Sequence, residues 1–380
     1  MRGHVRKRGK KWAVVVDLGQ DEDGRRRQHW QTCNTKREAE AALTETLNKL
    51  DHQDFTEPSK QTVAGFFDEW LESTRTTIRA STWINYQAFT AAHIVPRLGR
   101  LPLRKLTVSH LNGFYADLLA EGRVGQGQGG LAASTVRYVH AIVHKALRDA
   151  TKWGRLTKNV ADLASPPRQR GRPPLRTWTG PELRSFLESV EGHRFYSVYY
   201  VAATTGARRG EVLGLRWRDV DLTTGRLAIV QTRARTATGE GFSTPKTARG
   251  QRSVAIDPRT VAVLQAHRRR QLEQRLALGI GGPGPDGLVF TNEDSTPITH
   301  AQVSADFRAR VKASDLPSIR FHDLRHTHAT LALAAGVHPK VVSERLGHST
   351  VSITLDVYSH AIPAMEEEAA AKVAALVFGA

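Results

Sequence analysis

Three stretches of the sequence hold side chains whose types and spacing could carry chemistry. Thr204–Trp217 reads TTGARRGEVLGLRW, Arg320–Gly336 reads RFHDLRHTHATLALAAG, and Leu346–His360 reads LGHSTVSITLDVYSH. Guanidinium groups bind phosphate oxygens through paired N–H donors, and histidine carries a proton at near-neutral pH. A tyrosine hydroxyl attacks only when a base or a positive field favours its phenolate. These residue types could therefore bind an anion or take part in chemistry.

The first stretch also has a structural interpretation. Gly206 is expected to end one helix, and the segment after it to begin another, with Arg208 and Glu211 three residues apart on one face. An ion pair at this spacing is common on helix surfaces and contributes little to stability. Glu211 is expected to hold the Arg208 guanidinium in one orientation, with Arg208 itself or the nearby backbone as its partner.

The second stretch places His322 and Arg325 one turn apart at the start of a helix, where free N–H groups favour an anion. Together with His322, the residues His326 and His328 suggest a metal site. The sequence lacks the HExxH arrangement, and a histidine-rich helix start is weak support for metal binding. Metal catalysis is therefore disfavoured, and no cofactor is expected.

The third stretch predicts a helix from Pro339 to Gly347, with His348 in the turn that follows. Ser349 or Thr350 could cap the next helix, and Tyr358 would then lie about 12 Å along it. Because its spacing from preceding apolar residues also suits a buried stripe, Tyr358 by itself could be a core residue with a satisfied hydroxyl.

The composition favours a nucleic-acid partner. The chain has 380 residues, 55 Lys and Arg against 37 Asp and Glu, and a formal net charge of +18. Apolar residues make up 40% and charged residues 24%, a balance that supports globular domains. So basic a protein is expected to bind a polyanion. The single cysteine, Cys33, excludes an internal disulfide, and neither a signal peptide nor a membrane span is predicted.

Three domains are expected, at residues 1–55, 61–165 and 172–380. In the first, KWAVVVDLG and RRRQHWQTC predict strands around a turn at QDEDG, and a helix capped by Asn34 or Thr35 follows. A solvated basic hairpin is the plainer interpretation, but the overall charge favours a small sheet that presents its basic face to a DNA groove. The second is helical, with a loop at GQGQGG, and the basic, proline-rich SPPRQRGRPP separates it from the third.

The third domain is predicted to be mainly helical with one strand pair. RLAIVQT and QRSVAID are the two expected strands, joined by a long basic turn that contains Lys246. Without the surrounding motifs, Lys246 would be interpreted as a solvent-facing turn residue. The fold class is thus multidomain α+β: a small N-terminal β-sheet plus helix, a helical middle domain, and a mainly α domain with a small antiparallel β-sheet.

Taken in order, the motifs resemble those of the tyrosine recombinases, the phage integrase family. TGARRGE, a lysine in a strand turn, HDLRHTHAT and LGHSTVSITLDVYSH follow one another as in that family. The resemblance covers the whole third domain, and the first two domains look like arm-binding and core-binding domains. It implies phosphate activation by the following residues: Arg208 (rather than Arg209), Lys246, His322, Arg325 and His348.

The resemblance also implies that Tyr358 is the nucleophile and forms a 3′-phosphotyrosine with DNA. An integrase of this kind would insert and excise a mobile element or phage genome without a metal. Its expected partner is double-stranded DNA, at core-type and arm-type sites. It would act as a homo-tetramer on that DNA, and an accessory DNA-bending or directionality factor could take part. It would act in the cytoplasm of the host, at the nucleoid.

Alternatives from other classes are a non-catalytic DNA-binding regulator and a type IB topoisomerase-like enzyme. The complete series of cationic residues plus a tyrosine disfavours the regulator, and the basic N-terminal module disfavours the topoisomerase and a chromosome-dimer-resolving recombinase. The tail PAMEEEAAAKVAALVFGA could cap its own domain, but docking on a neighbouring subunit is favoured, as in the family.

Overall fold

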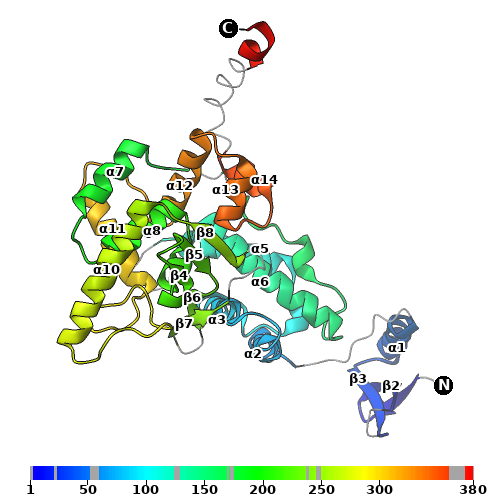
Figure 1. The fold of residues 1–380 in the computed structure, drawn as a ribbon. Coiled ribbons are helices and arrows are strands. Elements are labelled where there is room, and N and C mark those ends of the chain that lie inside the picture. The colour runs from blue at the N-terminus through cyan, green and yellow to red at the C-terminus, as the bar shows by residue number, and fades with distance from the viewer. Residues whose placement is uncertain are drawn as a thin grey trace. The chain divides into compact units, whose positions relative to one another are not determined.

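The computed structural model describes residues 3–20, 24–51, 60–123, 129–168, 171, 175–236, 239–244, 250–358 and 373–379 (Figure 1). It divides into two compact units, Met1–Gly171 and Arg172–Ala380. Among the described residues, no helix is both long and apolar enough to span a membrane. The centre of the expected turn at QDEDG, most of the loop at GQGQGG and half of the basic linker lie outside the described residues.

The first unit begins with an antiparallel sheet in the order β1-β2-β3, packed on one helix. Its elements are β1 (Gly3–Arg8), β2 (Lys11–Gln20), β3 (Arg26–Cys33) and α1 (Lys36–Asp51). Val14 and Val16 on β2 are buried against Ala39 on α1, and Thr35 caps α1 by accepting from the backbone N–H of Glu38 at 3.2 Å. The two predicted strands and the helix are confirmed. Strand β1 was not predicted, because its mostly charged sequence carries little apolar alternation.

The rest of this unit is helical, as expected. Its elements are α2 (Val63–Thr74), α3 (Ala80–Phe89), the π-helical turn η1 (Thr90–Ile94), α4 (Val95–Leu98), η2 (Leu103–Lys105), α5 (Val108–Glu121), α6 (Ala133–Lys152) and η3 (Val160–Leu163). The apolar faces of α2, α5 and α6 share one core. The indole of the buried Trp70 donates to Asp149 at 2.9 Å, which satisfies its polar atom inside that core.

The second unit is mainly helical. Among the described residues, its labelled helices are α7 (Gly180–Ser189), α8 (Tyr196–Thr205), α9 (Arg209–Leu213), η4 (Trp217–Asp219), α10 (Pro258–Ala277), α11 (His300–Lys312), α12 (Asp323–Ala334), α13 (Pro339–Leu346) and α14 (Val351–Tyr358), and residues 373–378 are also helical. Rings from α7, α8 and α11 meet in its core, where Phe307 lies within 6.0 Å of Trp178, Phe186 and Tyr199. Helices α12, α13 and α14 form a group at one end of this core (Figure 1).

The strands of the second unit differ in part from the expectation. Strands β5 (Arg226–Ile229) and β8 (Arg252–Ala255) pair antiparallel as predicted, and β4 (Val220–Asp221) extends their sheet. The connection between β5 and β8 was wrongly predicted as a single long turn. It contains a second antiparallel pair, β6 (Thr232–Thr236) and β7 (Gly239–Ser243). Their glycine- and threonine-rich sequences lack the apolar alternation by which strands are recognised.

Helix α9 packs on strand β6 with almost no space between the two backbones. A Cβ atom added at Gly210 would lie 2.5 Å from both the carbonyl oxygen of Arg233 and the Oγ1 atom of Thr232. At Gly214 it would lie 3.1 Å from the backbone nitrogen of Arg233. These glycines therefore fix how closely the β6–β7 hairpin approaches the helix that begins after Arg208.

The substitution Gly210→Ala should destabilise the second unit by about 1–3 kcal/mol, because its methyl group overlaps backbone atoms that cannot rotate away. Gly180→Ala is the matched control: it also lies in a first helical turn, and its added Cβ meets nothing within 4 Å. Thermal unfolding of the two variants measures the difference. Equal melting temperatures would mean that α9 and β6 can move apart to accept the methyl group without loss of stability.

Candidate active site

Arg208 lies at the N-cap of α9, and Glu211 fixes its side chain. The Nη1 atom of Arg208 donates to Glu211 Oε1 at 2.8 Å, and its backbone N–H donates to Glu211 Oε2 at 2.9 Å. The Arg208 side chain remains 42% exposed, whereas that of Glu211 is 3% exposed. The expected pairing is confirmed, but it is no surface ion pair. The Glu211 carboxylate is buried and holds one edge of the Arg208 guanidinium, while the Arg208 side chain stays partly exposed to solvent.

A second guanidinium, that of Arg252 on β8, holds the same carboxylate. Its Nη2 atom donates to Glu211 Oε2 at 2.8 Å. Burial by itself would raise the pKa of the Glu211 carboxyl, but the Arg252 hydrogen bond and the charges of Arg252 and Arg208 outweigh it and hold the pKa below its usual range. Glu211 is therefore ionised at neutral pH, shared by two cations.

Among the predicted cations that the structure describes, Arg325 is the most enclosed. It lies on the first turn of α12 and is 3% exposed. Its Nη1 atom donates to the carbonyl of Gly206 and its Nη2 atom to the carbonyl of Leu346, both at 2.8 Å. A guanidinium has five N–H donors in a rigid plane, so two backbone carbonyls are enough to fix that plane.

The C-terminal end of α13 collects three guanidinium groups on three successive carbonyls. The carbonyl of Arg345 accepts from Arg252 Nε at 2.6 Å, that of Leu346 from Arg325, and that of Gly347 from Arg208 Nη2 at 3.3 Å. The last carbonyls of a helix have no partner within the helix and carry the negative end of its dipole. They are therefore suited to gather cations.

His348 follows directly, after the left-handed Gly347 that ends α13. Its Nδ1 atom lies 2.8 Å from the hydroxyl of Thr354, which is fully buried on α14. Burial, followed by the charges of Arg325 and Arg208, lowers the pKa of His348 to about 4. The imidazole is therefore neutral at pH 7 and stands beside two guanidinium groups.

His322 behaves in the same way at the start of α12. It is exposed, yet loss of solvation, followed by the charges of His326 and Arg325, lowers its pKa to about 4. The rings of His322 and His326 meet edge to face with centroids 5.3 Å apart. A neutral imidazole at this place can accept a proton.

Behind these residues, Arg345 and His328 join α13 to α8 and β8. Arg345 donates to His328 Nε2 at 3.2 Å and to the carbonyls of Ala255 and Thr204 at 2.8 and 3.0 Å. His328 Nδ1 lies 3.0 Å from the carbonyl of Ala203, and burial lowers the pKa of this histidine to about 4. A neutral His328 can thus donate through Nδ1 and accept through Nε2, a structural role instead of metal binding.

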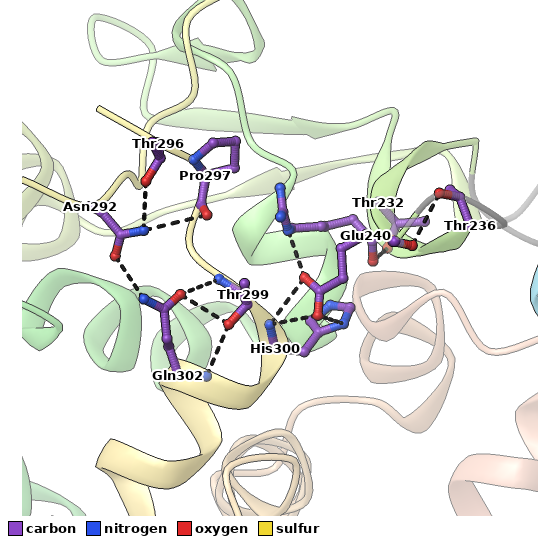
Figure 2. Close-up of polar contacts among 11 residues, drawn as sticks. Thr232, Thr236, Glu240, Asn292, Thr296, Pro297, Thr299, His300 and Gln302 are labelled. Atoms are coloured by element: carbon purple, nitrogen blue, oxygen red, sulfur yellow. Dashed lines mark hydrogen bonds and ion pairs between the residues drawn. The ribbon is translucent and has the colours of Figure 1, made fainter. Parts of the chain in front are cut away.

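Glu240 anchors the β6–β7 hairpin beside this site. Figure 2 shows its carboxylate at the start of α11, where it accepts from the backbone N–H of His300 at 3.1 Å. It also accepts from Arg233 Nε at 2.8 Å. Next to it, Gln302 bonds both the backbone N–H and the hydroxyl of Thr299 and closes the cap of α11 (Figure 2). The hairpin is thereby attached to a helix of the unit core as well as to α9.

The structure therefore brings Arg208, Glu211, His322, Arg325 and His348 into one electrostatically coupled group. The backbone of Tyr358 is described as the last residue of α14, the helix that also carries Thr354. The side chain of Tyr358 and the whole of Lys246 lie outside what the structure describes. In the described part of the chain, no group of three or more His, Cys, Asp or Glu residues is arranged to hold a metal ion.

Sequence reasoning missed Arg252, Arg345 and Thr354. Arg252 lies in QRSVAID, which was interpreted only as a strand, and Arg345 was one more basic residue of a short helix. Their partners are 41 and 90 residues away in the chain. Spacing along the chain cannot reveal such contacts. The only available signal was an arginine in a strand whose other residues are mostly apolar or small.

Three family profiles match this chain. That of the phage integrase family matches residues 179–365, that of the N-terminal SAM-like domain of phage integrases matches residues 62–119, and that of an arm DNA-binding domain matches residues 4–50. The three matches follow the order of the predicted domains and lie within their ranges.

Curated relatives align over most of their length. A tyrosine recombinase XerC-like protein of Caldanaerobacter subterraneus subsp. tengcongensis is 28% identical over 96% of this chain and 96% of its own. The putative prophage phiRv2 integrase of Mycobacterium tuberculosis is 29% identical over 90% and 87%. The ICEBs1 integrase of Bacillus subtilis is 27% identical over 80% of each.

Solved structures share the fold. The Tn1549 transposon integrase in complex with transposon right end DNA superposes with a TM-score of 0.66 at 22% identity, over 81% of this chain and 99% of that one. The lambda integrase tetramer bound to a Holliday junction gives 0.56 at 18% identity, over 94% and 95%. These likenesses support the α+β architecture predicted from the sequence.

A titration of labelled histidines tests the electrostatics of the site. His348 should have a pKa of about 4 in the free protein, and Arg208→Ala should raise it while leaving it below the usual value, because burial is the larger cause. Added inorganic phosphate should also raise the pKa of His348, since an anion favours the imidazolium. Protonation of His348 would then move to a higher pH window, and phosphate would bind more tightly as the pH falls through it.

His267 is the internal control for this titration. Burial also lowers its pKa to about 4, but it lies on α10 and bonds the carbonyl of Val289 at 2.7 Å. Neither Arg208→Ala nor phosphate should move it. A His348 that titrates near 6.5 in the free protein would contradict the coupled cationic group.

Proposed function

Since the chain belongs to the phage integrase family and is a site-specific tyrosine recombinase that cleaves and rejoins DNA, we propose that the coupled group at the end of α13 is its phosphate-binding site. The observation that carries the proposal is the set of three guanidinium groups gathered on the carbonyls of Arg345, Leu346 and Gly347. Arg208 and Arg325 bind the two non-bridging oxygens of the scissile phosphate. His348 supplies a further donor to the same oxygens.

Preorganised donors are the largest expected contribution of this site to catalysis. The phosphodiester is already anionic, and its charge spreads over more oxygens as the nucleophile approaches. Donors that are fixed before the substrate arrives need no reorganisation during the reaction. Two carbonyls fix Arg325, and Glu211 with the Gly347 carbonyl fixes Arg208. The same cations favour the phenolate form of a nearby tyrosine.

The covalent step exchanges one phosphate ester for another. The Oη atom of Tyr358 attacks the phosphorus, a Tyr358–phosphate bond forms at the 3′ side, and the bond from phosphorus to the 5′ oxygen breaks. The phenol proton passes to a base, for which neutral His322 is suited. The departing 5′ oxygen takes a proton from Lys246. Because the ester energy is retained, a 5′-hydroxyl of another strand can reverse the attack and rejoin the DNA.

The other domains bind DNA at separate sites. We assign residues 1–55 to arm-type sites, 61–165 to core-type sites and 172–380 to catalysis; the match of residues 4–50 to an arm DNA-binding domain supports the first assignment. On strand β1, Arg6 stacks over the exposed ring of Trp30 on β3 at 4.3 Å, which adds an aromatic group to a basic sheet. That module would recognise DNA with a sheet.

Integration and excision of a mobile element or phage genome are the proposed reactions in the cell, with four copies acting on paired sites. Support comes from the integrases among the relatives and from the lambda integrase tetramer bound to a Holliday junction. Such a protein would act in the cytoplasm of its host, at the nucleoid, with an accessory bending or directionality factor as an additional partner.

Tyr358→Phe tests the nucleophile. With a nicked suicide DNA substrate that traps the intermediate, the unsubstituted protein should give a covalent protein–DNA band and the variant none, because phenylalanine has no attacking oxygen. Core-site binding should be equal for both in a gel-shift assay. A band that survives the substitution would identify another nucleophile.

Arg208→Ala tests the phosphate grip. Cleavage of the same substrate should fall about 10²–10³-fold, the usual effect of removing one preorganised donor, while affinity for the core site changes little. Arg218→Ala is the control, since Arg218 pairs with Asp286 at 2.8 Å and has 48% side-chain exposure, close to that of Arg208. Affinity that fell as steeply as cleavage would show that Arg208 serves binding alone.

A further inference from the structure

The protein occupies every nitrogen of the Arg252 guanidinium. Nε donates to the carbonyl of Arg345 at 2.6 Å, Nη1 to the carbonyl of Gly250 at 3.1 Å, and Nη2 to Glu211 Oε2 at 2.8 Å. Its side chain is 7% exposed. A buried guanidinium with this set of partners is arranged to hold protein groups in place.

Each of the three groups that accept from Arg252 belongs to, or adjoins, a different segment of the site. Glu211 orients Arg208, as its 2.8 Å contact with Arg208 Nη1 shows. The carbonyl of Arg345 belongs to the end of α13, just before the residues that accept from Arg325 and Arg208 and before His348. Gly250 is the first described residue after the segment that contains Lys246.

We propose that Arg252 is a positioning residue for strand cleavage. Its buried guanidinium holds the start of α9, the end of α13 and the beginning of β8 in fixed positions around the scissile phosphate. The inference rests on the proposed function of that site and adds to it a residue outside the three stretches on which the sequence analysis based the site. Arg252 acts on the reaction through Glu211 and the Arg345 carbonyl.

Lysine cannot replace Arg252 in this role. The three acceptors lie around a planar fork, and each guanidinium nitrogen faces one of them, whereas an ammonium is a single centre at the end of a flexible chain. Loss of Arg252 also leaves the buried Glu211 carboxylate with one cation instead of two. Arg208 would then be the only guanidinium bonded to that carboxylate. Small displacements of a catalytic group are enough to slow a reaction about 10²-fold.

The experiment compares single-turnover cleavage of the suicide substrate by four variants: Arg252→Lys, Arg252→Met, Glu211→Gln and the double variant Arg252→Met/Glu211→Gln. Arg252→Met and Arg252→Lys should both slow cleavage about 10²-fold while the core-site Kd changes less than about threefold. Because Arg252 acts partly through Glu211, the loss in the double variant should be far smaller than the product of the two single losses.

Arg216→Met is the matched control. Arg216 is another poorly exposed arginine of this unit, with 16% side-chain exposure, and it also pairs with a carboxylate, that of Asp219, at 2.6 Å. It should lower the melting temperature without slowing cleavage. If Arg216→Met slows cleavage as much as Arg252→Met, or if the double variant shows the full product of losses, the positioning role is overturned.

A readout that needs no catalysis separates this inference from the proposed function. The Nε–H resonance of Arg208, followed by NMR in the full chain without DNA, should be a single sharp signal in the unsubstituted protein and should broaden or split in Arg252→Met. An unchanged resonance overturns the positioning role. Absence of any covalent band from the unsubstituted protein, with the Arg208 signal changed as expected, would refute the proposed function and leave the role of Arg252 in orienting Arg208 standing.

Discussion

The end of helix α13 is the constraint on which the rest of the site depends. Its last carbonyls have no helical partner, and they meet guanidinium groups from the start of α9, from α12 and from β8. The contacts from the start of α9 and from β8 span 139 and 93 residues of the chain and that from α12 spans 21, and all three bring their elements to the same few atoms. The turn at Gly347 adopts a left-handed conformation with φ of 66°, which glycine adopts at little cost, and it directs His348 out of the helix toward the same group.

Among the described residues of this group, cationic side chains outnumber anionic ones, an imbalance that favours an anion. Glu211 is shared between Arg208 and Arg252, and Arg325 is held by neutral carbonyls. The excess shows in the histidines: burial and the adjacent arginines lower the pKa of His322 and His348 to about 4. A bound phosphate would relieve the repulsion among these cations and raise the pKa of both histidines. Binding of the anion would therefore also favour the protonated imidazoles that donate to it.

The surrounding elements make the site rigid at a point where the chain itself is irregular. Helix α9 is only five residues long, and it is held by the close approach of Gly210 to β6. Glu240 ties the next strand to the capped start of α11 (Figure 2). Arg345 and His328 brace the back of α13 against α8. Groups that must be fixed before a substrate arrives need supporting contacts of this kind.

The sequence by itself determined two helix ends at the site, the pairing of strands β5 and β8, and the residue types that gather at the site. Gly206 and Gly347 marked helix ends because they supply a left-handed backbone conformation, and the spacing of His322 and Arg325 placed both on the first turn of one helix. These are local properties, and they extend over a few residues. Strands β1, β6 and β7 escaped recognition because charged or small residues replace the apolar alternation that strands normally show.

Only the tertiary structure decided which acceptor each of the many arginines binds. Arg252, Arg345 and Arg216 cannot be told apart by sequence pattern, yet they serve Glu211, the back of α13 and Asp219 respectively. A guanidinium takes its role from the acceptors that reach it in space. Those acceptors are largely backbone carbonyls, which every residue has, so their selection is made by packing and leaves no mark on residue type.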